Sequence, residues 1–171
     1  NLSDKNFFSL ENVKIGIDST YFRHVCESEI SDLVDDFISR ELCDYYKATK
    51  VTDLQLPLLE ELRIAHLLTI ATEMRSGYHK EITQKASIFS HPTRLTMLAI
   101  TPQLGMDYLN AQRLRSAAMQ AYDEIFDKVD VIAVPTVGIT APLLPRSTRY
   151  GESDYNITGH LMRFAYLANF L

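Results

Sequence analysis

Short strand patterns alternate with amphipathic helix patterns along this chain, and that alternation constrains its fold more than any other feature. Residues 13–18 alternate apolar side chains with polar or small ones, and residues 129–134 form a compact, β-branched run that Pro135 ends. A third strand pattern covers residues 50–56. Because strands that alternate with helices form layered structures, we predict an α/β fold. Three strands make only part of a sheet, so we expect a fragment rather than a complete domain.

Four segments between and after these strands repeat apolar residues at helical spacing. The expected helices begin at Ser28 as an N-cap, near Leu59, at Asp107 and at about Thr158. Each has an apolar stripe that is expected to be buried: Ile30, Leu33, Val34, Phe37, Ile38 and Leu42 in the first, Leu59, Leu62, His66, Ile70 and Met74 in the second, Leu114, Ala118, Ala121, Ile125 and Val129 in the third, and Leu161, Phe164, Ala165 and Ala168 in the last. His66 is expected to be a core or boundary histidine rather than a ligand. Pro92 and Pro102 interrupt the less regular stretch 78–104, and we expect a short helix between these two prolines. Residues 135–156 contain three prolines and polar turn residues, which predicts a long irregular connection.

The composition excludes several classes of functional site. The closest pair among the six glycines, Gly151 and Gly159, is eight positions apart, whereas dinucleotide-binding, phosphate-binding and nucleophile-elbow loops need closer glycines. The net charge of −5 argues against nucleic acid as a partner, because nucleic-acid-binding domains carry a basic face. No two of the five histidines are three or four positions apart, so no helical metal site is expected.

The cysteines and the hydropathy of the chain bear on its compartment. Cys26 and Cys43 are too few for a disulfide scaffold, which favours free thiols in a reducing compartment. No stretch reaches the 18 or so apolar residues that a membrane span needs. No signal peptide is recognised, and the chain opens at Asn1 as an excised segment would. We therefore expect an intracellular protein that is soluble or peripherally associated with a membrane.

Several segments together carry a resemblance to a known family. Residues 130–136 read Asp-Val-Ile-Ala-Val-Pro-Thr, residues 140–142 read Thr-Ala-Pro and residues 151–153 read Gly-Glu-Ser. Residues 161–164 and 168–171 read Leu-Met-Arg-Phe and Ala-Asn-Phe-Leu, and the earlier segments 56–66 and 107–115 agree in order and spacing. From about Asn12 to its end, the chain resembles the amidase-signature family, and within it the plant-type fatty acid amide hydrolase branch.

The resemblance implies a serine hydrolase of linear amides, and for this branch a hydrolase of N-acylethanolamines and related fatty acid amides. It also implies a mixed β-sheet core covered by helices, of which residues 1–171 would be the C-terminal portion of a single amidase domain. Members of the family use a Ser-Ser-Lys triad and a Gly/Ser-rich oxyanion loop, both expected upstream of this segment. No catalytic residue, cofactor or metal is therefore expected in this chain, which should be inactive by itself.

Four residues correspond by position to parts of the branch that line the acyl channel: Ile100, Leu104, Gly159 and His160. The branch carries hydroxyl or acidic residues where Gly159 and His160 stand, which leaves the substrate preference open. Core packing for Ile100 and Leu104, and a helix N-terminus for Gly159, are equally weighted alternatives. The expected partner is a fatty acid amide substrate and not nucleic acid, while peripheral membrane association and a homodimer stay open.

Two other functions remain as alternatives. One is the A subunit of a tRNA-dependent amidotransferase, which the acidic balance and the Leu-Met-Arg-Phe segment disfavour. The other is a non-catalytic binding or interaction module that keeps only this half of the fold. Paired serines within a Gly/Ser-rich stretch upstream would favour the enzyme, and their absence would favour the module.

Overall fold

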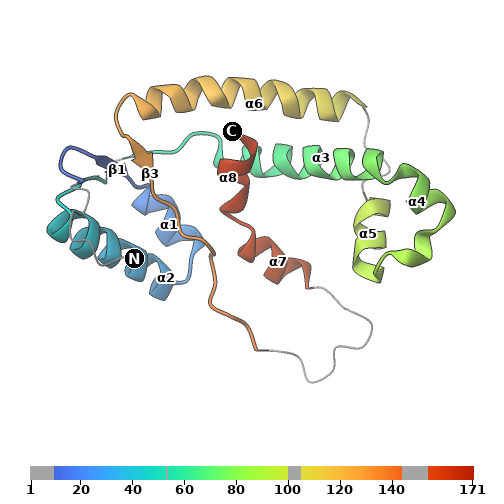
Figure 1. The fold of residues 1–171 in the computed structure, drawn as a ribbon, viewed down its shortest axis with the longest axis horizontal. Coiled ribbons are helices and arrows are strands. Elements are labelled where there is room, and N and C mark those ends of the chain that lie inside the picture. The colour runs from blue at the N-terminus through green and yellow to red at the C-terminus, as the bar shows by residue number, and fades with distance from the viewer. Residues whose placement is uncertain (1–9, 53, 100–104, 144–153) are drawn as a thin grey trace, which may run out of the picture. The chain divides into compact units, whose positions relative to one another are not determined.

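The computed structural model describes residues 10–52, 54–99, 105–143 and 154–171, which form a mostly helical chain with a small parallel sheet (Figure 1). The chain divides into two compact units. Unit 1 comprises Asn1–Pro57 and Ala121–Thr140, and unit 2 comprises Leu58–Gln120 and Ala141–Leu171. The predicted α/β class is confirmed, with helices contributing most of the described residues.

The sheet belongs to unit 1 and contains three short parallel strands among the described residues. They are β1 (Lys14–Gly16), β2 (Thr49–Val51) and β3 (Val131–Ile132), in the order β2-β1-β3. Ile15 of the central strand pairs with Lys50 on one side and Val131 on the other. Gly16 allows a close approach, because a Cβ there would lie 2.6 Å from Leu54 Cδ2 and 3.0 Å from Val129 Cγ1. The three predicted strands are present, and each is shorter than predicted.

Three helices of unit 1 follow the first strand: α1 (Ser19–Val25), α2 (Ser28–Phe37) and the π-helix η1 (Ile38–Tyr45). The N-cap of α2 is Glu27 rather than the predicted Ser28. Glu27 instead holds the segment after β3, since its N–H donates to the Gly138 carbonyl and its carboxylate accepts from the Thr140 N–H, both at 2.9 Å. The seven-residue α1 was not predicted, because two turns of helix carry too little periodicity to recognise.

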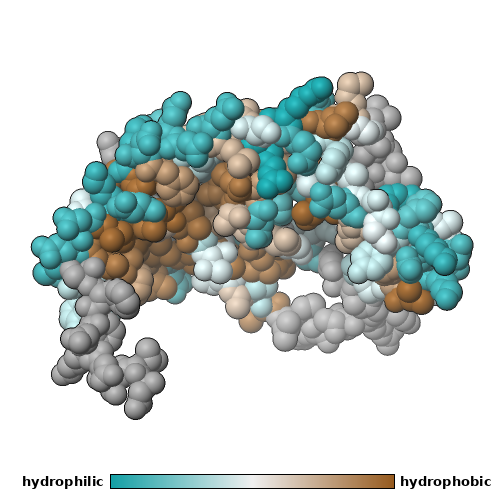
Figure 2. Space-filling model, turned by 45° about the horizontal axis from the view of Figure 1, so that its top comes forward, coloured by the Kyte–Doolittle hydropathy of each residue, from teal (hydrophilic) through white to brown (hydrophobic). Residues whose placement is uncertain are grey.

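Apolar periodicity in α2 does not by itself sort buried from exposed residues. Ile38, just after α2 on the predicted stripe, is buried, whereas Leu33 and Phe37 on the same stripe are 67% and 54% exposed. Large exposed apolar side chains also occur in unit 2, for example Ile64 and Leu67 of α3. Figure 2 shows apolar surface of this kind in brown among the teal hydrophilic side chains. A stripe marks the amphipathic face, and the available neighbours decide how much of it is covered.

The second strand was predicted to run over residues 50–56, but β2 ends at Val51, and residues 54–56 lie outside the strand where Asp18 binds the backbone. The Asp18 carboxylate, which is buried, accepts from the Tyr21 N–H at the start of α1 and from the Leu56 N–H, each at 2.9 Å. Leu54 and Leu56 are buried. The Leu56 N–H is thus satisfied by a side chain instead of by a neighbouring strand.

We expect Asp18→Ala to loosen this corner of unit 1. The substitution removes the cap of α1 and leaves the Leu56 N–H buried without an acceptor, at a cost of about 1–3 kcal/mol. If opening is local, the Leu56 amide should exchange its hydrogen roughly 5- to 150-fold faster, as measured by hydrogen–deuterium exchange. The exposed Asp123→Ala variant is the control and should leave this exchange unchanged. Equal exchange at Leu56 in both variants would contradict the role given to Asp18.

Unit 2 is helical in its described residues. The long helix α3 (Leu59–Gly77) is followed by α4 (His79–Gln84), the 3-10 turn η2 (Ala86–Ile88) and α5 (His91–Ala99). The helix α6 (Gly105–Phe126) crosses from unit 2 into unit 1 at Ala121, and α7 (Tyr155–Leu161) and α8 (Ala165–Phe170) end the chain. The predicted helix from Leu59 to about Gly77 is confirmed at both ends. The helix expected at Asp107 begins two residues earlier, at Gly105.

The single last helix predicted from about Thr158 is wrong, because a turn at residues 162–164 divides it into α7 and α8. The break changes which side chains are buried. Phe164 is buried as predicted, whereas Ala168 is exposed and Tyr166, Leu167 and Phe170 of α8 are buried instead. The turn is closed by short-range bonds such as Ala165 N–H to the Met162 carbonyl at 3.2 Å. Burying these larger side chains compensates for the interrupted helical ladder.

Candidate functional site

The two candidate residues that lie among the described residues, Gly159 and His160, are neighbours on α7. Asp154 caps this helix by accepting from the Asn156 and Ile157 N–H groups at 2.9 and 3.1 Å. Gly159 is exposed, and a Cβ placed there would meet no atom within 4 Å. Ile100 and Leu104 lie outside the described residues. Whether all four residues line one surface therefore stays a prediction.

His160 presents an unused polar atom. Its side chain is half-buried, and its Nδ1 atom is buried without a hydrogen-bond partner among the described residues. A buried ring nitrogen without a partner has a desolvation cost that a further hydrogen-bonding group can relieve. His160 is therefore the candidate residue best suited to meet a polar group of another molecule or of another part of the protein.

An ion-pair network ties the turn after α7 to the first turn of α3. Arg163 Nη1 lies 3.3 Å from Glu60 Oε1, and Arg63 Nε lies 3.1 Å from the other oxygen, Glu60 Oε2. The Arg163 side chain is only 19% exposed, so solvent screens this long-range pair less than an open surface pair. The sequence showed these residues as parts of two separate family segments. Only the fold brings the segments into contact.

The helix α8 is held on α3 and α6 by an aromatic cluster within unit 2. The Phe170 ring lies edge-on to the His66 imidazole, with centroids 5.9 Å apart, and Arg115 Cζ lies 5.6 Å from the same ring centroid. The Tyr166 ring is also near His66, at 6.5 Å. Burial lowers the pKa of His66 below its ordinary value of 6.5. His66 is thus a boundary histidine that packs against rings, as its place on the apolar stripe predicted.

The lowered pKa of His66 predicts a pH-dependent stability. The unfolded chain binds the proton more readily than the folded chain, so this contribution to stability is present above pH 6.5 or so and declines as the pH falls. We expect His66→Phe, which keeps the ring contacts and removes the titrating group, to reduce the loss of thermal stability between about pH 7 and pH 5. Exposed His79→Gln is the control. An unchanged pH profile in His66→Phe would contradict this role.

A second polar cluster, in unit 1, contains a serine and a lysine. Lys50 Nζ lies 2.6 Å from Asp35 Oδ1 and donates to Ser39 Oγ at 3.0 Å, while the Ser39 hydroxyl donates to the Asp35 backbone carbonyl at 2.8 Å. An ammonium group paired with a carboxylate has no lone pair to accept a proton. Among the described residues, the Ser39 hydroxyl is hydrogen-bonded to the Asp35 carbonyl and the Lys50 ammonium, and neither group can remove its proton. This cluster therefore lacks the chemistry of a nucleophile and its base.

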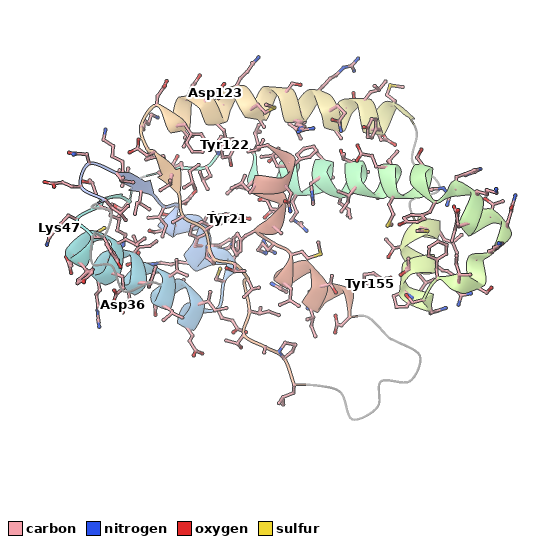
Figure 3. The ribbon with its side chains drawn as sticks, viewed as in Figure 1. Tyr21, Asp36, Lys47, Tyr122, Asp123 and Tyr155 are labelled. Atoms are coloured by element: carbon pink, nitrogen blue, oxygen red, sulfur yellow. The ribbon has the colours of Figure 1, made fainter. Side chains whose placement is uncertain are left out.

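Unit 1 also contains a buried tyrosine with a raised pKa. Tyr122, in the last part of α6, is buried and donates to the Pro57 carbonyl at 3.2 Å, whereas its neighbour Asp123 is exposed (Figure 3). Burial, followed by the nearby Asp18 carboxylate and Tyr21, raises the pKa of the Tyr122 phenol. The hydroxyl accordingly stays protonated at neutral pH and serves as a hydrogen-bond donor within the fold.

Sequence analysis missed one apolar groove in unit 2. A groove of about 270 Å³ runs between α3 and α6. Five apolar residues and three polar ones line it: Ile64, Ala65, Leu68, Ala111 and Leu114, with Glu61, Asp107 and Asn110. Both helices show apolar residues at helical spacing, but this spacing alone does not show that the two apolar faces meet.

Among the described residues there is no group of three or more histidine, cysteine or acidic side chains that could hold a metal ion. In the same part of the chain, no helix has the length and hydropathy of a membrane span.

The chain is similar in sequence and in fold to known amide hydrolases, although no family model matches it. Over 171 residues, 99% of this chain, it is 36% identical to a fatty acid amide hydrolase from Medicago truncatula. The fold matches an amidase crystal structure with a TM-score of 0.70 and 20% identity, covering 94% of this chain and 37% of that one. It also matches a bacterial aryl acylamidase of the amidase-signature family with a TM-score of 0.67 and 19% identity, over 95% of this chain and 36% of that one. The chain is homologous to the amidase-signature hydrolases.

The match confirms the family resemblance and limits what it implies. The aligned region corresponds to only 28% of the Medicago truncatula relative, so the chain spans just over a quarter of the length of that fatty acid amide hydrolase. The solved structures are about 20% identical and support the fold alone. The position of the expected Ser-Ser-Lys triad upstream, and the channel-lining role of Gly159 and His160, accordingly stay predictions.

Proposed function

We propose that this chain forms part of a serine amidase that hydrolyses fatty acid amides, such as N-acylethanolamines, to a fatty acid and an amine. The observation that carries the proposal is the 36% identity to a fatty acid amide hydrolase across almost the entire chain. In this proposal the nucleophile, its lysine base and the oxyanion donors belong to the remainder of the amidase. The segment contributes sheet, covering helices and part of the wall against which the acyl chain lies.

The proposal assigns substrate contact to α7. Gly159 is open to solvent on one side of the helix, and His160 has a buried ring nitrogen free of partners among the described residues. A glycine and an imidazole shape a surface in different ways, the first by leaving space and the second by offering a hydrogen bond. We expect Gly159 to admit acyl chain and His160 to orient a polar group near it.

A hybrid enzyme tests the function directly. In the hybrid amidase, the 171 aligned residues of the Medicago truncatula relative are exchanged for this chain. We expect the hybrid to hydrolyse a long-chain N-acylethanolamine with a kcat/KM within roughly 200-fold of the parent enzyme, the scale on which wall contacts act. A fluorophosphonate probe should label its nucleophilic serine. The parent enzyme and the hybrid with that serine changed to alanine are the controls.

Two outcomes would overturn parts of the proposal. A hybrid that is labelled but hydrolyses only short-chain amides would retain the amidase activity and reject fatty acid amides as substrates. A hybrid that melts cooperatively, as the parent does, yet shows neither labelling nor hydrolysis would favour the non-catalytic module.

A further inference from the structure

The helix that carries His160 has little packing of its own. None of the residues of α7 is buried, whereas α8 buries Tyr166, Leu167 and Phe170. At its start, α7 is attached only loosely to α5, because the Tyr155 hydroxyl reaches the Pro92 carbonyl at the long distance of 3.5 Å (Figure 3). The position of α7 within unit 2 therefore depends chiefly on the turn at residues 162–164, where it joins α8.

That turn is fixed to α3 by Arg163. Its guanidinium reaches across 103 residues of sequence to Glu60, at 3.3 Å, from a largely shielded position. The Arg163 backbone N–H also closes on the carbonyl of His160, at 3.4 Å. A movement of Arg163 away from α3 would therefore carry the end of α7, and His160 with it.

We infer that the Glu60–Arg163 ion pair is a positioning device that sets where His160 stands relative to α3, and that Glu60 is a specificity-determining residue acting through it. The inference rests on the proposed function, in which Gly159 and His160 contact the substrate. Glu60 and Arg163 touch no substrate in this assignment. Their effect is to hold α7 at one distance from the packed pair α3 and α8, and so to fix one wall of the acyl site.

Glu60 has a second partner that provides a matched control. Arg63 binds the other carboxylate oxygen from one turn further along the same helix, at 3.1 Å. Removing this local pair with Arg63→Gln leaves the bridge to Arg163 in place. Removing the carboxylate with Glu60→Gln breaks both pairs, and Arg163→Gln removes the bridge alone. A loss that these two variants share and that Arg63→Gln lacks therefore reports the bridge to Arg163.

In the hybrid amidase, we expect Glu60→Gln and Arg163→Gln to lower kcat/KM for a long-chain amide by roughly 10-fold, mainly through KM. Hydrolysis of a short-chain amide should stay within about twofold, and Arg63→Gln should behave as the unchanged hybrid. The reversed pair Glu60→Arg with Arg163→Glu, made in the Arg63→Gln background to avoid two facing cations, should recover most of the long-chain loss. Equal losses for both chain lengths, or the same loss in Arg63→Gln, would overturn the inference.

Hydrogen–deuterium exchange separates this inference from the proposed function, because it needs no activity. Glu60→Gln should speed the exchange of amides in Tyr155–Leu161 and leave those of Ala165–Phe170 unchanged. Faster exchange in both helices, or in neither, would overturn the positioning role. If the hybrid hydrolyses no amide but exchange changes only in α7, the proposed function fails while the positioning of α7 by Glu60 stands.

Discussion

Replacing Ile125 by alanine is expected to destabilise unit 1 by about 2–5 kcal/mol. Ile125 is 8% exposed and lies in the last turn of α6, where its carbonyl also accepts from the Lys128 and Val129 N–H groups. Truncation removes buried methyl and methylene groups and leaves a cavity that the surrounding residues fill only in part. The measurement is the shift of the urea unfolding midpoint of the hybrid amidase relative to the unchanged hybrid.

Two further positions on the same segment give this prediction its controls. Leu114 is on the same predicted stripe but is half-buried in the groove wall, so Leu114→Ala should cost less than Ile125→Ala. Lys128 is exposed just after the helix, and Lys128→Ala should stay within about 0.5 kcal/mol. Equal costs at the three positions would mean that the buried face of this segment has been assigned wrongly.

Substitutions within this chain are expected to change specificity, while replacement of the upstream serine should abolish hydrolysis. In the hybrid amidase, His160→Ala and Leu104→Ala should lower kcat/KM by about 10- to 200-fold, by an amount that depends on acyl chain length. Loss of the nucleophilic serine should lower activity on the order of a million-fold. These magnitudes are far apart, so steady-state kinetics with short and long amides can decide between the two roles.

Probe labelling completes this test. The His160→Ala and Leu104→Ala hybrids should still react with a fluorophosphonate at the serine outside this chain. A collapse of activity that is independent of chain length, with cooperative melting preserved, would place a catalytic group in this segment. Loss of labelling in either variant would do the same, and the assignment of the triad to the remainder of the amidase would then be wrong.

The parts of the fold that follow from local periodicity were predicted well. The helix from Leu59 to Gly77 was predicted at both ends, and the three strands were found where the apolar runs stand. Predictions that depended on a distant partner were less accurate. The second strand ends at Val51, and the Leu56 N–H beyond it is bound by Asp18 rather than by a neighbouring strand. The last helix breaks where Arg163 turns toward Glu60. Neither partner can be recognised from the residues near the break.

The sequence by itself determined the alternation of strands and helices, the absence of clustered glycines and the relationship to the amidase-signature hydrolases, because these depend on the order and spacing of residues along the chain. The tertiary structure alone decided which apolar faces are covered, as Leu33 and Ile38 show on one predicted stripe. It also decided that Glu60 and Arg163 meet, and that the His160 ring nitrogen is buried. The physical reason is that periodicity records which side of an element is apolar, whereas burial and ion pairing depend on residues many positions away that only folding brings near.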